Sequence, residues 1–275
     1  MTYSLPSSLS DALDLLGDAG ARVIAGGTDY YPALLPGMQP DALLDVTRIA
    51  GLADILHMND TIRIGAAATW TDVVNADLPP AFDALKQAAH QVGSVQIQNA
   101  GTVAGNICNA SPAADGVPPL LALDAQIELA SAARGTRVLL LRDFMTGVRK
   151  TALAADELAT AIVVPKPPVG MVSGFEKLGS RRYLVISIVM TAANIVLDGK
   201  GRIGAARVAV GSCSAVAQRM TGLETDLVGQ DPAALVISDD HLAPLAPIDD
   251  VRGSAEYRLE AAREHIQRAI RKAAA

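Results

Sequence analysis

Residues 99–115 combine small residues with short polar side chains, a composition suited to holding a nucleotide. Gly101 and Gly105 permit tight backbone geometry, so the chain can approach a ligand closely and line it with N–H groups. The polar side chains of the segment are those of Asn99, Thr102, Asn106, Asn109, Ser111 and Asp115. An irregular turn held by Asx caps is the alternative interpretation. We favour a loop that contacts the pyrophosphate of a dinucleotide, because the segment gathers so many donors and acceptors.

A second turn of small residues, Ala25-Gly26-Gly27-Thr28-Asp29, lies earlier in the chain. It follows a predicted strand over residues 22–25, and Thr28 is placed to cap a helix that ends at residues 36–37. The N–H groups and the dipole of a helix N-terminus favour an anion. Asp29 could cap the helix or reach a ribose. A tight turn without a ligand is the alternative, and two glycines alone do not decide between the two interpretations.

The sequence motifs contain no complete catalytic set. No G-x-G-x-x-G follows a predicted strand and no G-K-[ST] is present, so neither segment is a Rossmann fingerprint or a P-loop. The two cysteines, Cys108 and Cys213, cannot by themselves ligate an iron–sulfur cluster or a structural zinc. The four histidines share no metal spacing. If the chain binds a dinucleotide, the chemistry therefore belongs to the cofactor.

Composition limits the classes of partner. The 275 residues carry a formal net charge of −6, which argues against a nucleic-acid partner because such proteins usually show a basic stripe. The N-terminus lacks the basic and apolar regions of a signal peptide, and no apolar run reaches transmembrane length. We therefore expect a cytoplasmic protein with no membrane span.

Hydrophobic periodicity predicts an α+β chain in three units. Residues 1–50 read as a small βαβ-like unit, and residues 51–165 read as a larger mixed unit that contains the 99–115 segment. Three prolines within residues 165–168 predict a linker. Residues 169–275 form the last unit. Its predicted elements are a buried antiparallel hairpin over 185–197 and 203–210, and an amphipathic helix over 255–272.

Four segments together resemble a known family. The two small-residue segments are similar to the paired FAD loops of the flavoprotein (medium) subunit of molybdenum hydroxylases, the family of carbon monoxide dehydrogenase and xanthine dehydrogenase. Residues 175–182 resemble the start of that family's C-terminal domain, and residues 249–258 resemble its closing signature. The family usually has Gly-Gly-Asn in the second loop, where this chain has Ala104-Gly105-Asn106. Because the added methyl group is small, we expect binding to survive.

The resemblance implies a fold and a set of cofactor contacts. It implies a two-lobed FAD-binding domain of the vanillyl-alcohol-oxidase type over residues 1–165 (lobe 1 about 1–50, lobe 2 about 51–165). A C-terminal flavoprotein domain with a three-stranded antiparallel sheet and helices would follow over 169–275. The pyrophosphate would be held by Gly26, Gly27 and Thr28 with neighbouring Ile24, Ala25 and Asp29, and from the other side by Thr102, Gly105 and Asn106. The resemblance places Cys108 and Asn109 along the flavin or its ribityl chain, Asp115 at the adenosine ribose, and the backbone of Ile162 or Val163 against the isoalloxazine.

For Lys177 the resemblance implies a place at the pyrimidine edge of the flavin, where a cation would stabilise the anionic reduced ring. Without the resemblance, the simpler interpretation of Lys177 would be an exposed residue on a surface strand. Tyr183 lies near the expected flavin face and could gate access to it, or it could simply pack.

The function implied is electron transfer within a larger enzyme. Substrate would be hydroxylated at a molybdopterin centre on a large partner subunit, and electrons would pass through two [2Fe–2S] clusters on a small partner to FAD on this chain, then to an external acceptor. The assembly would be a dimer of heterotrimers. One alternative is a self-sufficient flavin oxidase of the vanillyl-alcohol type, although none of the four histidines lies in either predicted flavin loop to attach a flavin covalently. The other alternative is a non-catalytic nucleotide-binding subunit.

Overall fold

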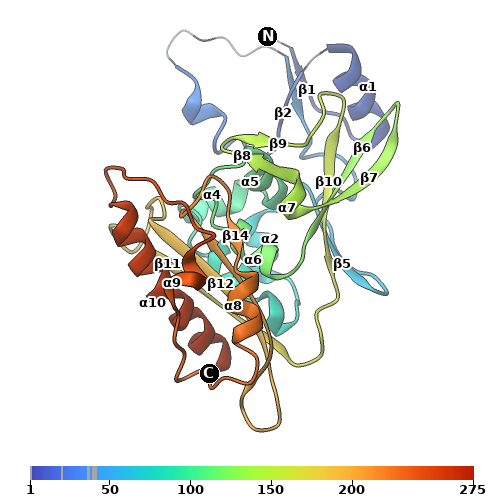
Figure 1. Ribbon diagram of the computed structural model, residues 1–275. Helices are drawn as coiled ribbons and strands as arrows, with labels where there is room; N and C mark the ends of the chain where they lie inside the picture. Colours follow the sequence, from blue (N-terminus) through green and yellow to red (C-terminus); the bar gives the residue numbers. More distant parts are fainter. Residues whose placement is uncertain (1, 20, 36–37, 39–41) are drawn as a thin grey trace.

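The N-terminal lobe is built on a three-stranded parallel sheet with the strand order β1-β3-β2. The computed structural model describes residues 2–19, 21–35, 38 and 42–275 (Figure 1). The elements of the lobe are β1 (Tyr3–Ser4), α1 (Leu9–Ala19), β2 (Arg22–Ile24) and β3 (Leu43–Asp45). The strand predicted over residues 22–25 is confirmed as β2. The sequence did not predict β1, because a strand of two residues carries no readable periodicity.

The helix predicted to begin at Thr28 is wrong. Residues Tyr31–Ala33 form a single 3-10 turn, η1, whose N-cap is Tyr30. Pro32 stands inside this turn and another proline follows at position 36, so the segment between them is too short for an α-helical hydrogen-bond ladder. The predicted helix end at residues 36–37 lies outside the described residues. The anion-binding argument from a helix dipole therefore does not apply at Thr28.

The second lobe contains a five-stranded antiparallel sheet with the order β4-β5-β10-β6-β7. The strands are β4 (Ile55–His57), β5 (Thr61–Gly65), β6 (Gln126–Ser131), β7 (Gly135–Leu140) and β10 (Leu158–Pro165). Strands β4 and β5 form a hairpin around Asn59-Asp60. Strand β10 is central, and its largely continuous apolar sequence is explained by burial on both faces.

Short helices connect the strands of this lobe. They are α2 (Trp70–Asn75), η2 (Pro80–Phe82), α3 (Asp83–Ala89), α4 (Val95–Ala100), α5 (Val103–Asn109), α6 (Val117–Ala122) and α7 (Leu141–Phe144), and a small hairpin of β8 (Met145–Gly147) and β9 (Lys150–Thr151) follows. Thr69 caps α2 through the capping box with Asp72, as predicted.

The prediction of an irregular loop over residues 99–115 is wrong for half of the segment. Residues 103–109 are the helix α5, and residues 99–100 end α4. Thr102 is the N-cap of α5, where its hydroxyl accepts a hydrogen bond from the N–H of Gly105 at 3.0 Å. The same small and polar residues that suggested a loop are thus a cap and a short, tightly packed helix.

The C-terminal part has a sheet with the order β11-β12-β13-β14. Its three long strands are β11 (Met171–Leu178), β12 (Val189–Leu197) and β13 (Ile203–Gly211), and β14 (Gln218–Arg219) adds two residues at the edge. The helices are α8 (Thr221–Asp226), α9 (Asp239–Leu242) and α10 (Ala255–Ala274). The predicted hairpin and the predicted amphipathic helix are confirmed as β12–β13 and α10. Helix α10 packs closely on β11, since a Cβ on Gly174 would lie 2.5 Å from the carbonyl oxygen of Ala269.

Helices α4, α5 and α6 lie between the five-stranded sheet of the second lobe and the C-terminal sheet, in the middle of Figure 1. One large hydrophobic cluster fills the first two lobes, and a second lies between the C-terminal sheet and α10. A small third cluster joins Ala84 and Ala122 to Phe175 and Met190. The segment that contains α4 and α5 is therefore packed against other elements on several sides. Such packing fixes its position, as a ligand-binding site requires.

Candidate functional site

The two small-residue segments touch each other. A Cβ placed on Gly26 would lie 1.8 Å from the carbonyl oxygen of Ala100 and 2.9 Å from the backbone nitrogen of Gly101. A Cβ on Gly101 would in turn lie 3.3 Å from Oγ1 of Thr28. The backbones therefore meet at a distance that only glycine allows. The predicted proximity of the two segments is correct, although the chain between them runs through two lobes.

Gly27 is required for a second reason. Its φ is +66°, a conformation that side chains other than glycine rarely adopt, and a Cβ there would lie 2.5 Å from Cε2 of Tyr31. The turn is closed by the N–H of Tyr31, which donates to the carbonyl of Gly27 at 3.1 Å. Of the neighbouring candidates, Ile24 is buried, Ala25 and Thr28 are half-buried, and Asp29 is exposed.

Trp70 packs against residues 99–116 and fixes the second small-residue segment. Its backbone N–H donates to the carbonyl of Gly101 at 3.1 Å, and its side chain is 1 % exposed. A Cβ on Gly101 would lie 3.6 Å from the indole, and a Cβ on Gly116 would lie 2.3 Å from it. Next to it, Thr69 and Thr102 form an isolated antiparallel bridge. Sequence analysis did not assign Trp70 to the site, because nothing in the local sequence links it to Gly116.

Asn106 carries the one observation that points directly to a ligand among the predicted contacts. Its Oδ1 is buried and, among the described residues, finds no hydrogen-bond partner. A Cβ on Gly116 would lie 3.2 Å from this oxygen, so the glycine keeps the space beside it clear. A buried amide oxygen without a donor costs about 1–3 kcal/mol. The residues present thus fit a nucleotide cofactor that supplies a donor to Asn106.

Cys108 and Asn109 follow on α5. Burial raises the pKa of the Cys108 thiol to about 12, so this cysteine stays protonated at neutral pH and is not a nucleophile. The side-chain oxygen of Asn109 accepts a hydrogen bond from the guanidinium of Arg149, and the N–H of Arg149 donates to the carbonyl of Ala110 at 2.9 Å. Arg149 thereby fixes the C-terminal end of α5, a position that favours a cation.

Asp115 and Lys177 form a buried ion pair. Nζ of Lys177 lies 2.6 Å from Oδ2 of Asp115, and the side chains are 4 % and 9 % exposed. Ser187 donates from Oγ to Oδ1 of Asp115 at 2.5 Å, and Lys177 also donates to the carbonyl of Gln91 at 3.3 Å. Burial raises the pKa of Asp115, and the ion pair and the hydrogen bond from Ser187 oppose that rise.

This contact brings the pair together, and the role of each residue at the cofactor stays a prediction. Asp115 was expected at the adenosine ribose and Lys177 at the pyrimidine edge of the flavin, which are opposite ends of the dinucleotide. Two groups 2.6 Å apart favour a shared place at one end. Ser187, the third member, was not predicted, because its approach to Asp115 depends on the packing of β12 against the second lobe.

The structure places Ile162 in the interior of the second lobe, and its contact with a flavin stays a prediction. Its side chain is fully buried in the large hydrophobic cluster. Its backbone belongs to the central strand β10, where it pairs with Ile64 on one side and Ile127 on the other. Its neighbour Val163 pairs with Arg63 and Gln126 in the same ladder. Both edges of the strand are thus occupied by neighbouring strands at these two residues.

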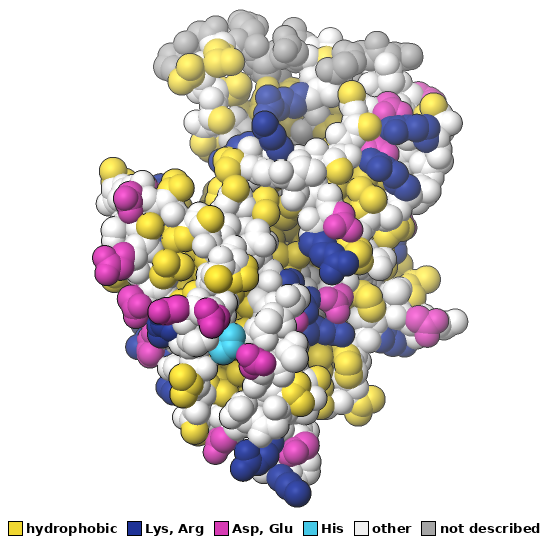
Figure 2. Space-filling model, in the orientation of Figure 1, with side chains coloured by type: hydrophobic (Ala, Val, Ile, Leu, Met, Phe, Trp, Pro, Cys, Tyr) yellow, Lys and Arg dark blue, Asp and Glu magenta, His cyan; other side chains and the backbone are white. Residues whose placement is uncertain are grey.

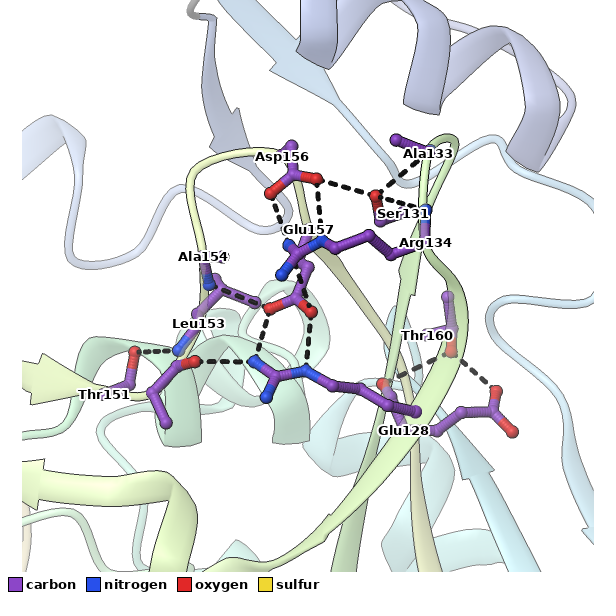
Figure 3. Close-up of polar contacts among 12 residues, drawn as sticks. Glu128, Ser131, Ala133, Arg134, Thr151, Leu153, Ala154, Asp156, Glu157 and Thr160 are labelled. Atoms are coloured by element: carbon purple, nitrogen blue, oxygen red, sulfur yellow. Dashed lines mark hydrogen bonds and ion pairs between the residues drawn. The ribbon is translucent and has the colours of Figure 1, made fainter.

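A polar network stands at the start of β10. Glu157 is 3 % exposed, and its carboxylate receives two hydrogen bonds from Arg137, at 2.6 Å and 2.7 Å. Figure 3 shows Asp156 and Glu157 both directed toward Arg134. These contacts fix the turn that leads into the central strand. Every carboxylate in the network is accounted for by a partner, so we assign it a structural role.

The face of the molecule in Figure 2 carries charges of both signs. Basic and acidic side chains are interspersed over the face in Figure 2, without a continuous basic stripe. Within the described ranges, no three His, Cys, Asp or Glu side chains gather as a metal site would require. No described helix has the length and apolar character needed to cross a membrane.

Tyr183, near the expected flavin face, is 58 % exposed. The guanidinium of Arg182 lies over its ring, 5.1 Å from the ring centroid. The gating role of Tyr183 stays a prediction.

Comparison with known proteins decides the family. Residues 1–167 match the model of the FAD binding domain in molybdopterin dehydrogenase, and residues 175–273 match that of the CO dehydrogenase flavoprotein C-terminal domain. The chain belongs to the FAD subunits of the molybdenum hydroxylases. Among its relatives, the xanthine dehydrogenase FAD-binding subunit of Escherichia coli O157:H7 is 32 % identical, over 100 % of this chain and 96 % of that protein.

Further relatives of this FAD subunit belong to enzymes with different names. The nicotine 6-hydroxylase medium subunit of Paenarthrobacter nicotinovorans is 31 % identical, over 99 % of this chain and 97 % of that protein. The crystal structure of the Cu,Mo-containing CO dehydrogenase in its cyanide-inactivated form superposes with a TM-score of 0.91 at 28 % identity, covering 100 % of this chain and 97 % of the other. The fold expected from the resemblance, an FAD-binding domain followed by a flavoprotein C-terminal domain, is confirmed.

Proposed function

We propose that this FAD subunit holds its cofactor between the Gly26-Gly27 turn and the first turn of α5. The carrying observation is the contact between Gly26 and Ala100, which brings the two backbones together. The buried Asn106 oxygen lacks a donor and would accept from a hydroxyl or N–H group of the cofactor, since a pyrophosphate itself has no hydrogen to donate. Thr28 and Thr102 supply hydroxyl groups on the two sides of this contact. Together these residues form two walls of backbone and short polar side chains that suit a pyrophosphate bridge.

The ends of the cofactor follow from the remaining residues. Asp29 is exposed at the outer edge of the turn and takes the ribose hydroxyls, in place of Asp115. Asp115 and Lys177 lie together on the C-terminal side, and we assign both to the flavin end. The Lys177 ammonium has three N–H groups, of which two point to Asp115 and Gln91, so one remains for a flavin oxygen.

We further propose that the chain is an electron-transfer subunit of a cytoplasmic complex. FAD supplies two-electron chemistry that can be divided into single steps. A small partner with two [2Fe–2S] clusters would deliver the electrons from a large molybdopterin-binding partner, in a dimer of heterotrimers. The residues of this chain bind and orient the cofactor and exclude water from Asp115 and Lys177. The domain boundary falls within residues 165–168.

The nucleotide can be tested with the only tryptophan of the chain. Trp70 lies against both Gly101 and Gly116, so binding beside these glycines should quench its emission. We expect strong quenching when the cofactor-depleted protein is titrated with FAD and much weaker quenching with FMN, which lacks the pyrophosphate bridge and the adenosine. Unchanged emission with FAD, or equal affinity for FMN, would overturn the proposed site. Nucleotide released by acid from the purified complex should be FAD.

The two rival functions have their own signatures. A self-sufficient oxidase would reduce its flavin with a small substrate in the absence of any partner. A non-catalytic subunit would purify without a flavin absorbance band even from the intact complex. We expect neither result, and co-purification of a molybdopterin chain and an iron–sulfur chain with this subunit would support the electron-transfer role.

A further inference from the structure

The closing segment of the chain contains a buried arginine with three fixed acceptors. The side chain of Arg258, in the first turn of α10, is 3 % exposed. Its guanidinium donates to the carbonyl of Ile188 at 2.6 Å, to the carbonyl of Ser212 at 3.2 Å and to Oδ1 of Asp250 at 2.7 Å. Two backbone carbonyls, one directly before β12 and one directly after β13, thereby converge on one charge.

Both carbonyls stand beside contacts with the flavin site. Ser187, directly before Ile188, donates its hydroxyl to Asp115. Ser212 donates its own backbone N–H to the carbonyl of Pro112 at 3.0 Å, with a φ of +63°. A left-handed φ at a serine is unfavourable by itself and persists where neighbouring contacts hold it. Arg258 therefore binds the residue that follows one of these contacts, Ile188, and the residue that makes the other, Ser212.

The arginine is itself held in place. Asp250 accepts a second hydrogen bond from the N–H of Arg252 at 2.8 Å, and reciprocal bonds with Gly253 close its turn at 3.2 Å. Ser254 caps α10 by accepting from the N–H of Tyr257 at 3.2 Å. The guanidinium is thus fixed by a turn and by a helix start, and it cannot move independently of either.

We propose that Arg258 is a positioning residue for the flavin site. It aligns Ser187 and Ser212, and through them it holds Asp115 and Pro112 in the geometry that the cofactor requires. The inference rests on the proposed function, since it assigns residues 110–115 to the flavin end of the site. It assigns a role to the closing segment, residues 249–258.

The test compares two arginines of the same helix. Arg258→Met removes the guanidinium, and Arg263→Met removes a guanidinium on α10 that also binds a carbonyl and an aspartate, those of Ile237 and Asp239, away from the site. With the FAD-containing complex, we expect R258M to weaken FAD binding by about tenfold or more and to shift the visible absorption bands of the bound flavin. R263M should stay within about twofold of the natural protein.

Two measurements separate positioning from simple stability. Hydrogen–deuterium exchange of residues 110–117, measured without cofactor, should accelerate in R258M and not in R263M. In a double-mutant cycle, R258M and S187A should be less than additive for FAD affinity, because both act through Asp115. Arg258→Lys keeps the charge and one carbonyl contact, so it should restore part of the FAD affinity. If R258M does not fold, R258K takes its place in the comparison with R263M.

The outcomes are distinct from those that test the cofactor itself. If R258M, or R258K in its place, matches R263M in both FAD affinity and exchange at 110–117, the positioning role is wrong. If the natural protein binds no FAD but exchange at 110–117 still accelerates selectively in R258M, the proposed function fails while the mechanical link from Arg258 to this segment stands.

Discussion

The ammonium of Lys177 lies 2.6 Å from the carboxylate of Asp115, and the pair closes the junction between the segment after α5 and strand β11. Neither side chain is more than 9 % exposed. Removing one member of such a pair leaves a buried charge without a partner and strongly lowers the stability of the fold. Removing both members together lowers it far less. The pair thus couples the flavin end of the proposed site to the packing of the C-terminal sheet.

Separate and joint removal of the pair should therefore give non-additive losses of stability. We expect Asp115→Asn and Lys177→Met each to lower the free energy of unfolding by about 3 kcal/mol, and the double variant to lose less than the sum. Denaturant unfolding of the four proteins measures this. Strict additivity would mean that the two groups do not interact in solution.

The close approach of Gly26 to Ala100 predicts that a single methyl group will open the cofactor site. In Gly26→Ala the new Cβ would overlap a carbonyl oxygen at 1.8 Å, so one backbone must move. We expect a loss of about 1–3 kcal/mol in stability and loss of FAD from the complex. The matched control is Gly17→Ala in α1. There an added Cβ would meet no described atom within 4 Å outside the neighbouring residues and the backbone of its own helix, so the variant should be neutral or stabilising by up to about 1 kcal/mol. Retention of FAD by G26A at natural affinity would contradict the proposed clamp.

Local patterns explain which parts of the fold the sequence could predict. The β12–β13 hairpin, α10 and the Thr69 capping box are each encoded by periodicity or by a cap within a short window. Residues 103–109 were mistaken for a loop because small residues favour loops, while the deciding hydroxyl of Thr102 acts as a cap only once the helix exists.

The contacts within the candidate site that the sequence did not predict have a tertiary origin. Lys177 and Asp115 are 62 residues apart, and no local pattern shows that they pair. Ile162 lies in a strand whose two neighbours, β5 and β6, come from distant parts of the chain, so its central position was not readable from residues 161–164 alone. The glycines were placed correctly because a close backbone approach leaves a direct mark on residue type.

The network at the start of β10 predicts that Arg137 matters for stability. Its hydrogen bonds to Glu157 hold the pKa of this carboxyl below its usual value. In Arg137→Met the Glu157 carboxylate, whose side chain is 2 % exposed, would lose two donors, and an undersatisfied buried carboxylate costs about 1–3 kcal/mol. Thermal unfolding should show a clearly lowered midpoint. Arg142→Met, which removes a 69 % exposed side chain 3.8 Å from Asp143, should leave the midpoint almost unchanged, and equal effects would argue against the network.

Asp250 should make the closing turn sensitive to acid. Hydrogen bonds from the N–H of Arg252 and from the Arg258 guanidinium lower its pKa from 3.8 to about 2. A carboxyl with a lowered pKa in the folded state stabilises the protein fully above its unfolded value, and this contribution is lost as the pH falls toward about 2.

The difference in unfolding free energy between the natural protein and Asp250→Asn should therefore be about 1 kcal/mol or more at pH 7 and should shrink between about pH 5 and pH 2. Urea titrations at a series of pH values measure this difference. Asp143→Asn, at an exposed carboxylate, should show no such convergence. A D250N difference that stays constant down to about pH 2.5 would mean that the carboxylate of Asp250 does not hold Arg258 in solution.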